Sequence, residues 1–430
     1  MSSLPEMFGP RLRALRTARG ISLSEFARRL YYSKGHVSRI ETGAQAPSPE
    51  FVRRCDAELD AKGTLVAMIR PAASQGAPEP PPDAGEEEVW LMSMTPGGGS
   101  SFARIGRRDV LLGGAAMLAG LGIPAALPAP VANAGEQLRH HRRLFDSARA
   151  LGQVAPPSAV LPMLVGQAQA LRSLSRQVHG RESAEVALLA SRTAEFAGWM
   201  AQEAGDVEAA EWWTGKAVEA ATAAGDDYMA SYALVRRALI SLYRGDAATT
   251  VALARQAQAR PDIPARILGL AAQREAQGHA LAGDYDACLH ALDRAGRLLR
   301  DGRTDQPDGP VIGTSHVSDP VAIVTGWCLY DLGRPVAATE VLDREIERIP
   351  VAATRAKTRF GARRALAHAA AGELEHACAL ARPILGQFPQ VGSATILTDV
   401  RKLAVTLRRW SSHPAVRELE PALTAALHHR

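Results

Sequence analysis

The sequence predicts an all-α protein, and three observations support that class. Apolar residues recur at helical spacing through most of the chain, and no stretch shows the pattern of a convincing strand. Alanine, leucine and arginine are abundant while aromatic residues make up only 5%, which is typical of helices packed through small side chains. A glycine-containing turn recurs about every 39 residues in the C-terminal part. Because 430 residues exceed one ordinary core, we expect at least two domains.

Residues 4–20 form the first expected helix. Phe8, Leu12 and Leu15 lie at helical spacing on one face, the opposite face is rich in arginine, and Gly20 ends the helix. This helix can therefore bury one side in a small core and keep a basic side in water.

Two short helices follow within residues 22–43, joined by a tight corner. Their apolar faces consist of Phe26, Ala27 and Leu30 in the first helix and of Val37 and Ile40 in the second. Ser33 is placed to cap the second helix, and Gly43 to end it. The outward residues of the second helix are basic, polar or small, namely Lys34, Gly35, His36, Ser38 and Arg39. A short helix with an apolar back and a basic front suits the major groove of DNA.

The next helix is expected to begin at Pro49, with Ser48 as its N-cap, and to carry an apolar stripe that closes the small core. A short apolar segment, Leu65–Ile69, completes a domain over residues 1–70. This domain contains twelve Lys or Arg and seven Asp or Glu, so its net charge of +5 equals that of the whole chain. Such a basic segment agrees with a nucleic-acid ligand.

Residues 8–70 resemble the Cro/C1-type (XRE) helix-turn-helix domain, a five-helix lambda-repressor-like fold, in the variant common among actinobacterial regulators. The matching residues are Arg16, Phe26, Ala27, Leu30, Ser33, Val37, Ser38, Ile40, Glu41, Gly43 and Pro47. The resemblance implies that residues 33–42 form the recognition helix of a DNA-binding domain.

The resemblance also assigns roles to individual side chains. Those expected to face the bases are Lys34, Gly35 and Arg39. Those expected near phosphates or groove edges are Ser33, His36 and Ser38. A structural ion pair between the first and third helices is expected from Arg16 and Glu41, and breaking it would strand a partly buried charge.

Two positions depart from the family pattern. Leu23 stands where the family usually has a glutamine that contacts phosphate, so one backbone contact is expected to be missing. Tyr31 stands at the corner, where the family usually has a glycine with positive φ. A tyrosine in that conformation is strained, or else the turn is shifted.

Residues 71–134 are expected to connect two domains. Residues 71–105 combine proline, glutamate and glycine-serine runs, which predicts a linker that lets its neighbours move independently. Residues 104–134 contain an Arg-Arg pair followed by an uncharged stretch, a pattern similar to a twin-arginine signal or a membrane anchor. Prolines limit any helix there to about fourteen residues, short of the roughly twenty needed to span a bilayer. Buried or linker structure is therefore favoured, and a membrane anchor is the alternative.

Residues 135–430 are expected to form helical pairs. The recurring turn lies at Gly205, Gly245, Gly283, Gly333 and Gly372. The spacings are 40, 38, 50 and 39 residues, and a polar loop at 301–319 accounts for the long interval. Pro350 and Pro389 are expected to end the second helices of two pairs. The pattern resembles a degenerate tetratricopeptide (TPR-like) repeat, which implies an α-solenoid with a concave binding surface.

The sequence contains no catalytic constellation. It lacks G-x-S-x-G, a phosphate-binding P-loop and a strand-linked G-x-G-x-x-G, so we expect neither enzyme activity nor a cofactor. The histidines show no metal-ligand spacing, and no metal site is expected. Reduced, buried thiols are expected for the four widely separated cysteines, Cys55, Cys288, Cys328 and Cys378.

Together these features predict a cytoplasmic, sequence-specific DNA-binding transcriptional regulator. Its N-terminal domain would bind double-stranded DNA, while its TPR-like domain would form a homodimer and bind a peptide, a small effector or a partner protein. The alternative is a membrane-anchored signal sensor or protein-interaction scaffold, held in the membrane through residues 104–134, in which DNA binding is secondary.

Overall fold

A computed structural model gives the fold of the chain. It describes residues 4–69, 89–94, 100–105, 133–260, 262–301, 312–313 and 316–428. The chain forms two compact units, of which the first comprises Met1–Ala72 with Asp227–Arg430 and the second comprises Ala73–Asp226. The N-terminal domain thus shares a unit with the later helical pairs, which differs from the expectation that a linker lets the two parts move independently. The predicted boundaries at residues 70 and 134 remain predictions.

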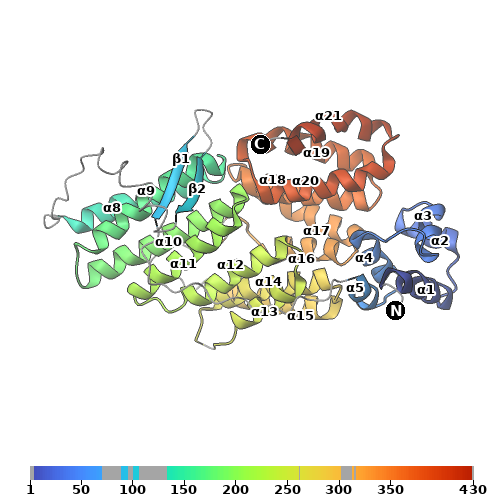
Figure 1. Cartoon of the computed structure of the whole chain (residues 1–430), viewed down its shortest axis with the longest axis horizontal. Coiled ribbons are helices and arrows are strands. Elements are labelled where there is room, and N and C mark those ends of the chain that lie inside the picture. Colours follow the sequence, from blue (N-terminus) through green and yellow to red (C-terminus); the bar gives the residue numbers. More distant parts are fainter. Residues whose placement is uncertain are drawn as a thin grey trace. The chain divides into compact units, whose positions relative to one another are not determined.

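Five helices form the N-terminal domain, as the sequence predicts (Figure 1). Their bounds are Leu4–Ala18 (α1), Leu23–Leu30 (α2), Lys34–Glu41 (α3), Pro49–Glu58 (α4) and Thr64–Ile69 (α5). Serine side chains at the N-caps of α2, α3 and α4 each accept a hydrogen bond from the amide three residues on, and these serines are Ser22, Ser33 and Ser48. The predicted apolar stripes meet in one core, whose fully enclosed members include Phe8, Leu12, Phe26, Val37, Phe51 and Leu65.

In the described residues of the second unit there are four long helices and a hairpin. The helices are Ala134–Leu151 (α8), Pro157–Ser175 (α9), Arg181–Ala204 (α10) and Val207–Ala223 (α11). The expectation that the chain has no strand is wrong here, because Val89–Met94 (β1) pairs antiparallel with Ser100–Ile105 (β2), in the register Val89↔Ile105 to Met94↔Ser100. Both strands carry apolar or aromatic residues, and a proline-glycine run separates them in the sequence, which is a hairpin signal.

The uncharged stretch after the Arg-Arg pair, residues 106–132, lies outside the described residues. Among the helices that the structure describes, none combines the length and the apolar character that crossing a membrane requires. The predictions for residues 104–134 fall mostly on this stretch and stay predictions.

Helical pairs make up the rest of the first unit. Their bounds are Met229–Tyr243 (α12), Ala247–Gln256 (α13), Ala265–Ala282 (α14), Tyr285–Asp301 (α15), Pro320–Asp331 (α16), Pro335–Glu347 (α17), Thr354–Ala370 (α18), Leu374–Val391 (α19), Ala394–Leu407 (α20) and Pro414–His428 (α21), with a short 3₁₀ turn at Arg408–Trp410. A core rich in alanine joins most of these helices, while Leu253 and Ala254 of α13 form a small separate cluster with Ala238 of α12. Pro350 follows the end of α17, whereas Pro389 lies inside α19, so the expectation that Pro389 ends its helix is wrong.

The recurring glycine turns have one conformation. All five glycines have φ between 75° and 88°, which is the left-handed region that favours glycine. The aspartates that follow three of them cap the next helix, each accepting from the amide three residues on, and these are Asp206, Asp246 and Asp284. All four cysteines are buried and unpaired, as expected.

Candidate nucleic-acid interface

The corner between α2 and α3 sets the direction of the candidate recognition helix. Tyr31 ends α2 in the left-handed conformation (φ 57°, ψ 43°), and its amide donates to the carbonyls of Ala27 and Arg28. Ser33 then starts α3 in an extended conformation and accepts a hydrogen bond from the amide of His36 at 3.2 Å. Both ends of the corner are therefore fixed by backbone hydrogen bonds.

The corner shows how the chain accommodates Tyr31 at a position where a glycine was expected. The turn has the positive φ that glycine adopts most easily, although the residue is tyrosine. A non-glycine residue in this region costs on the order of 1 kcal/mol, so other contacts must hold Tyr31 there. Leu23, the other departure, is half-buried and packs against the domain core, so its side chain serves packing.

The expected base-facing residues lie together on the open side of α3. Lys34, Gly35 and Arg39 are exposed, while Val37 and Ile40 on the opposite side of the helix are enclosed in the core. Arg39 donates through Nε to the side-chain oxygen of Gln45 at 3.1 Å, which orients its guanidinium. Such a guanidinium can donate two parallel hydrogen bonds to a guanine edge.

Gly35 lies beside Arg39 at the start of α3, where a Cβ would make only an ordinary van der Waals contact. A Cβ at this position would lie 3.5 Å from a terminal nitrogen of Arg39. The first turn of α3 contains no acidic residue, so the partial positive charge of the helix N-terminus is not offset there. The start of α3 is therefore favourable for a phosphate.

Ser33, Ser38 and His36 lie at the edges of this face. Ser33 is exposed and uses its oxygen as the helix cap, which leaves its hydroxyl hydrogen free to donate to a phosphate. Ser38 is half-buried, and its carbonyl accepts from the amide and hydroxyl of Thr42. The two serines thus combine a structural role with positions near the open side of α3.

His36 is packed more deeply than its outward assignment suggests. Its ring stacks on Tyr32 at a centroid distance of 4.9 Å and meets the edge of Phe51 at 5.6 Å. Burial lowers the pKa of His36, and the nearby Arg39 and Arg409 lower it further. A neutral imidazole in this position supports α3 from behind, which the spacing of residues along the helix could not reveal.

Arg16 and Glu41 join α1 to α3. Nε of Arg16 donates to Oε1 of Glu41 at 2.6 Å, and a terminal nitrogen donates to Oε2 at 2.9 Å. Both residues are buried, and Arg16 also donates to the carbonyl of Ile21 at 2.7 Å. Two parallel hydrogen bonds join the guanidinium to the carboxylate, so both buried charges have partners. A buried ion pair of this kind can hold α1 and α3 in a fixed relative position.

One group of side chains has the composition of a metal site. Asp343, His368 and His376 bring three possible ligand atoms within 4.8 Å of one another, from three different helices or turns. His368 already has a carboxylate on each ring nitrogen, since Nε2 lies 3.0 Å from Asp343 and Nδ1 lies 2.5 Å from Glu373. Arg364 also donates to Asp343. Asp343 and His368 thus already have partners in an ion-pair network, and we assign no metal to this group.

Comparisons with known proteins agree with the N-terminal geometry. Residues 7–68 match a family model described as a helix-turn-helix domain. No curated protein matches the chain. The match runs from within α1 to within α5 and includes every residue of the candidate interface. The chain therefore contains a helix-turn-helix domain, and this domain supports its identification as a DNA-binding regulator.

Proposed function

We propose that the protein is a sequence-specific transcriptional regulator of the XRE type, in which α3 reads the major groove of double-stranded DNA. The observation that carries the proposal is the exposed group Lys34, Gly35 and Arg39 on a helix whose other side is sealed by the domain core. The capped corner and the bidentate Arg16–Glu41 pair support the proposal, because they hold α3 rigidly in place.

The helical pairs after residue 134 are proposed to supply the remaining parts of a regulator. They would form a homodimer and bind a peptide, small-molecule or protein effector, since stacked helical pairs expose a long inner surface. An effector changes DNA binding only if its affinity differs between the DNA-competent form and the other forms. We propose that the protein is cytoplasmic, because its ligand would be chromosomal DNA, and that it has no enzyme activity, because its sequence contains no catalytic constellation.

We call the exposed group Lys34, Gly35 and Arg39 the reading face of α3. Replacing Arg39 tests whether this face contacts the DNA bases. DNA duplexes are first selected from a random pool by the unmodified protein, and affinities are then measured on selected and scrambled duplexes. Arg39→Ala should lose about 1–3 kcal/mol on the selected duplexes only, because a base contact carries sequence discrimination.

The control for this test is Arg13→Ala, which removes an exposed arginine of α1 from the same domain. It should retain the discrimination of the unmodified protein. If Arg39→Ala also retains both affinity and discrimination, α3 does not read DNA through this face.

A further inference from the structure

Three of the recurring glycine turns contact the DNA-binding domain within the first unit. A Cβ on Gly283 would lie 2.9 Å from Val66, and one on Gly333 would lie 2.4 Å from the carbonyl oxygen of Arg53. A Cβ on Gly372 would lie 2.7 Å from the ring of Tyr31. These turns follow α14, α16 and α18, each of which is the first helix of a pair. Three consecutive helical pairs therefore contact the domain through the turn between their two helices. We call these three contacts the docking seam.

Polar contacts reinforce the docking seam. The buried Arg54 guanidinium of α4 donates to the carbonyl of Ala370 at 2.6 Å, and Ala370 is the last residue of α18. A cation at a helix C-terminus satisfies a carbonyl that has no partner within the helix and complements the helix dipole. This contact ties the domain to the same turn that receives Tyr31.

An ion pair adds a further contact between the domain and the helical pairs. Arg409 donates to Oε2 of Glu50 at 2.6 Å, and both side chains are at least four-fifths buried. The guanidinium of Arg409 also lies over the ring of Tyr32, 4.2 Å from its centroid. A partly desolvated pair of this kind fixes orientation as well as contributing binding energy.

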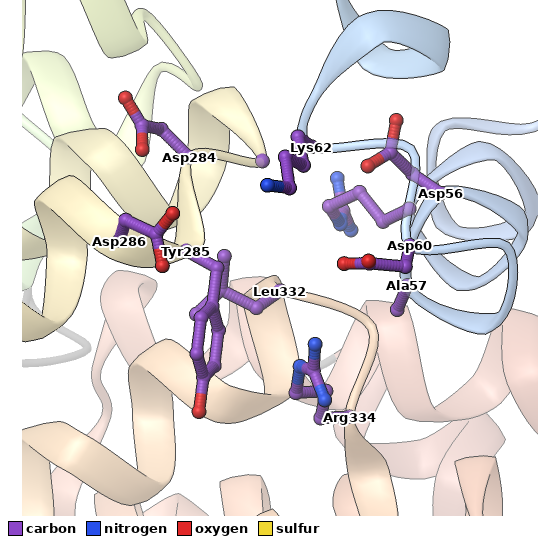
Figure 2. Close-up of a pocket in the computed structure, with 11 residues that line it drawn as sticks. Asp56, Ala57, Asp60, Lys62, Asp284, Tyr285, Asp286, Leu332 and Arg334 are labelled. Carbon is purple, nitrogen blue, oxygen red and sulfur yellow. The ribbon is translucent and has the colours of Figure 1, made fainter.

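Charges are complementary across the cavity between the domain and the helical pairs. The cavity measures about 290 Å³, and Figure 2 shows Lys62 of the domain extending toward the side that carries Asp284 and Asp286. Asp60 of the domain and Arg334 of the α16–α17 turn also point into it. Each side of the cavity thus presents charges that attract those of the other side.

The docking seam also accounts for Tyr31. The side chain packs against Gly372, and the guanidinium of Arg54 lies 5.3 Å from the centroid of its ring. A glycine at the corner would avoid backbone strain but would offer no ring to this contact. The strained residue is therefore placed where the domain meets the helical pairs.

We propose that the turns at Gly283, Gly333 and Gly372 are a docking surface for the chain's own DNA-binding domain, which holds the recognition helix in one orientation while leaving it open to DNA. The seam uses α4, α5 and the Tyr31 corner, whereas Lys34, Gly35 and Arg39 stay exposed. The orientation of the reading face is thus set by the helical pairs. The statement that this face is open to DNA rests on the proposed function, whereas the docking itself does not.

The experiment compares two glycines that have the same backbone conformation. Gly333 (φ 75°) lies against the backbone of Arg53, while Gly245 (φ 76°) has open space at its Cβ position. Gly333→Ala and Gly245→Ala therefore carry the same strain, and only the first obstructs docking. Spin labels on Arg13→Cys and Val351→Cys, both exposed, report the distance between domain and helical pairs, because the four native cysteines are buried.

We expect a narrow distance distribution for the otherwise unmodified chain and for Gly245→Ala, and a distribution at least twice as broad for Gly333→Ala. Equal widths in the two alanine variants, or a broad distribution in the unmodified chain, would overturn the proposal.

In a second comparison, Arg409→Glu should broaden the distance distribution, and adding Glu50→Arg to the same chain should narrow it again. Failure of that rescue would also count against docking.

Binding to a short duplex with a single site separates docking from DNA reading. Gly333→Ala should bind it within about twofold of Gly245→Ala, because the docked form already leaves the reading face open. An affinity gain of tenfold or more in Gly333→Ala would contradict an open reading face, since it would mean that docking blocks DNA. If no variant binds DNA while the distance distributions behave as expected, the proposed function fails and the docking surface stands.

Discussion

The DNA-binding domain and the helical pairs of the first unit fill their cores in different ways. The domain relies on a few large side chains, and Phe8, Phe26 and Phe51 are each fully enclosed. The helical pairs rely on alanine and on glycines that bring helices close together. For example, a Cβ on Gly326 of α16 would lie 2.7 Å from Leu342 of α17. The comparison teaches that deletions of side-chain volume threaten the domain, whereas additions of volume threaten the helical pairs.

The largest expected effect comes from Phe51→Ala in the domain. Phe51 packs on Tyr32 at 5.0 Å and supports His36 of α3, so its loss leaves a cavity behind the recognition helix. The free energy of unfolding of the domain should fall by about 3–5 kcal/mol, measured by chemical denaturation. Val336→Ala, at an exposed valine of α17, should change the free energy of unfolding of the first unit by less than about 0.5 kcal/mol. Comparable losses in both variants would show that the large side chains are not the basis of the domain core.

A smaller effect is expected from added volume in the helical pairs. Gly326→Ala should lower the free energy of unfolding of the first unit by about 1–3 kcal/mol, because the new methyl group meets Leu342. Gly386→Ala in α19 is the matched control, since its Cβ meets nothing within 4 Å. The control should be neutral or stabilising by up to about 1 kcal/mol, as expected for alanine in a helix. Equal stabilisation of the two variants would show that added volume at Gly326 does not threaten the packing of the helical pairs.

The smallest effect concerns a charged group in the helical pairs. Burial alone would raise the pKa of Glu275, but hydrogen bonds from His279, Gln258 and Arg255, with the charge of Arg294, bring it down to about 2. A carboxylate whose pKa lies below its ordinary value of 4.5 stabilises the fold fully above pH 4.5. That stabilisation disappears as the pH falls from 4.5 toward 2.

Glu275→Gln should therefore cost about 1–2 kcal/mol at pH 7, and the difference from the unmodified protein should shrink below pH 4.5. Denaturation at several pH values measures both quantities. Glu340→Gln, at an exposed glutamate of α17, should cost less than about 0.5 kcal/mol. A loss at Glu275 that stays constant down to pH 2 would mean that packing, and not charge, explains it.

Local patterns predicted most of the fold and only part of the interface. Helical spacing predicted the first four helices of the domain, and the family resemblance implied the fifth. Serine caps predicted helix starts and the glycine period predicted the turns between pairs, because each is decided by neighbouring residues. The strands at residues 89–105 were missed because the run was weighed as a linker. The packing of His36 and the role of Tyr31 depend on residues that the chain brings together from far away, and Arg54 meets Ala370 across 316 positions. No spacing rule along the chain reports such a contact.

The distance along the chain between Glu50 and Arg409 also has a consequence for biosynthesis. These residues are separated by 359 positions, so the partner of Glu50 is made near the end of translation. At about 5–20 residues per second, the ribosome needs on the order of 20–70 s to cover that interval. During this time the helix-turn-helix segment has left the ribosome and its docking surface is incomplete. In a nascent chain the helix-turn-helix domain can therefore be exposed well before the helical pairs that orient it have been made.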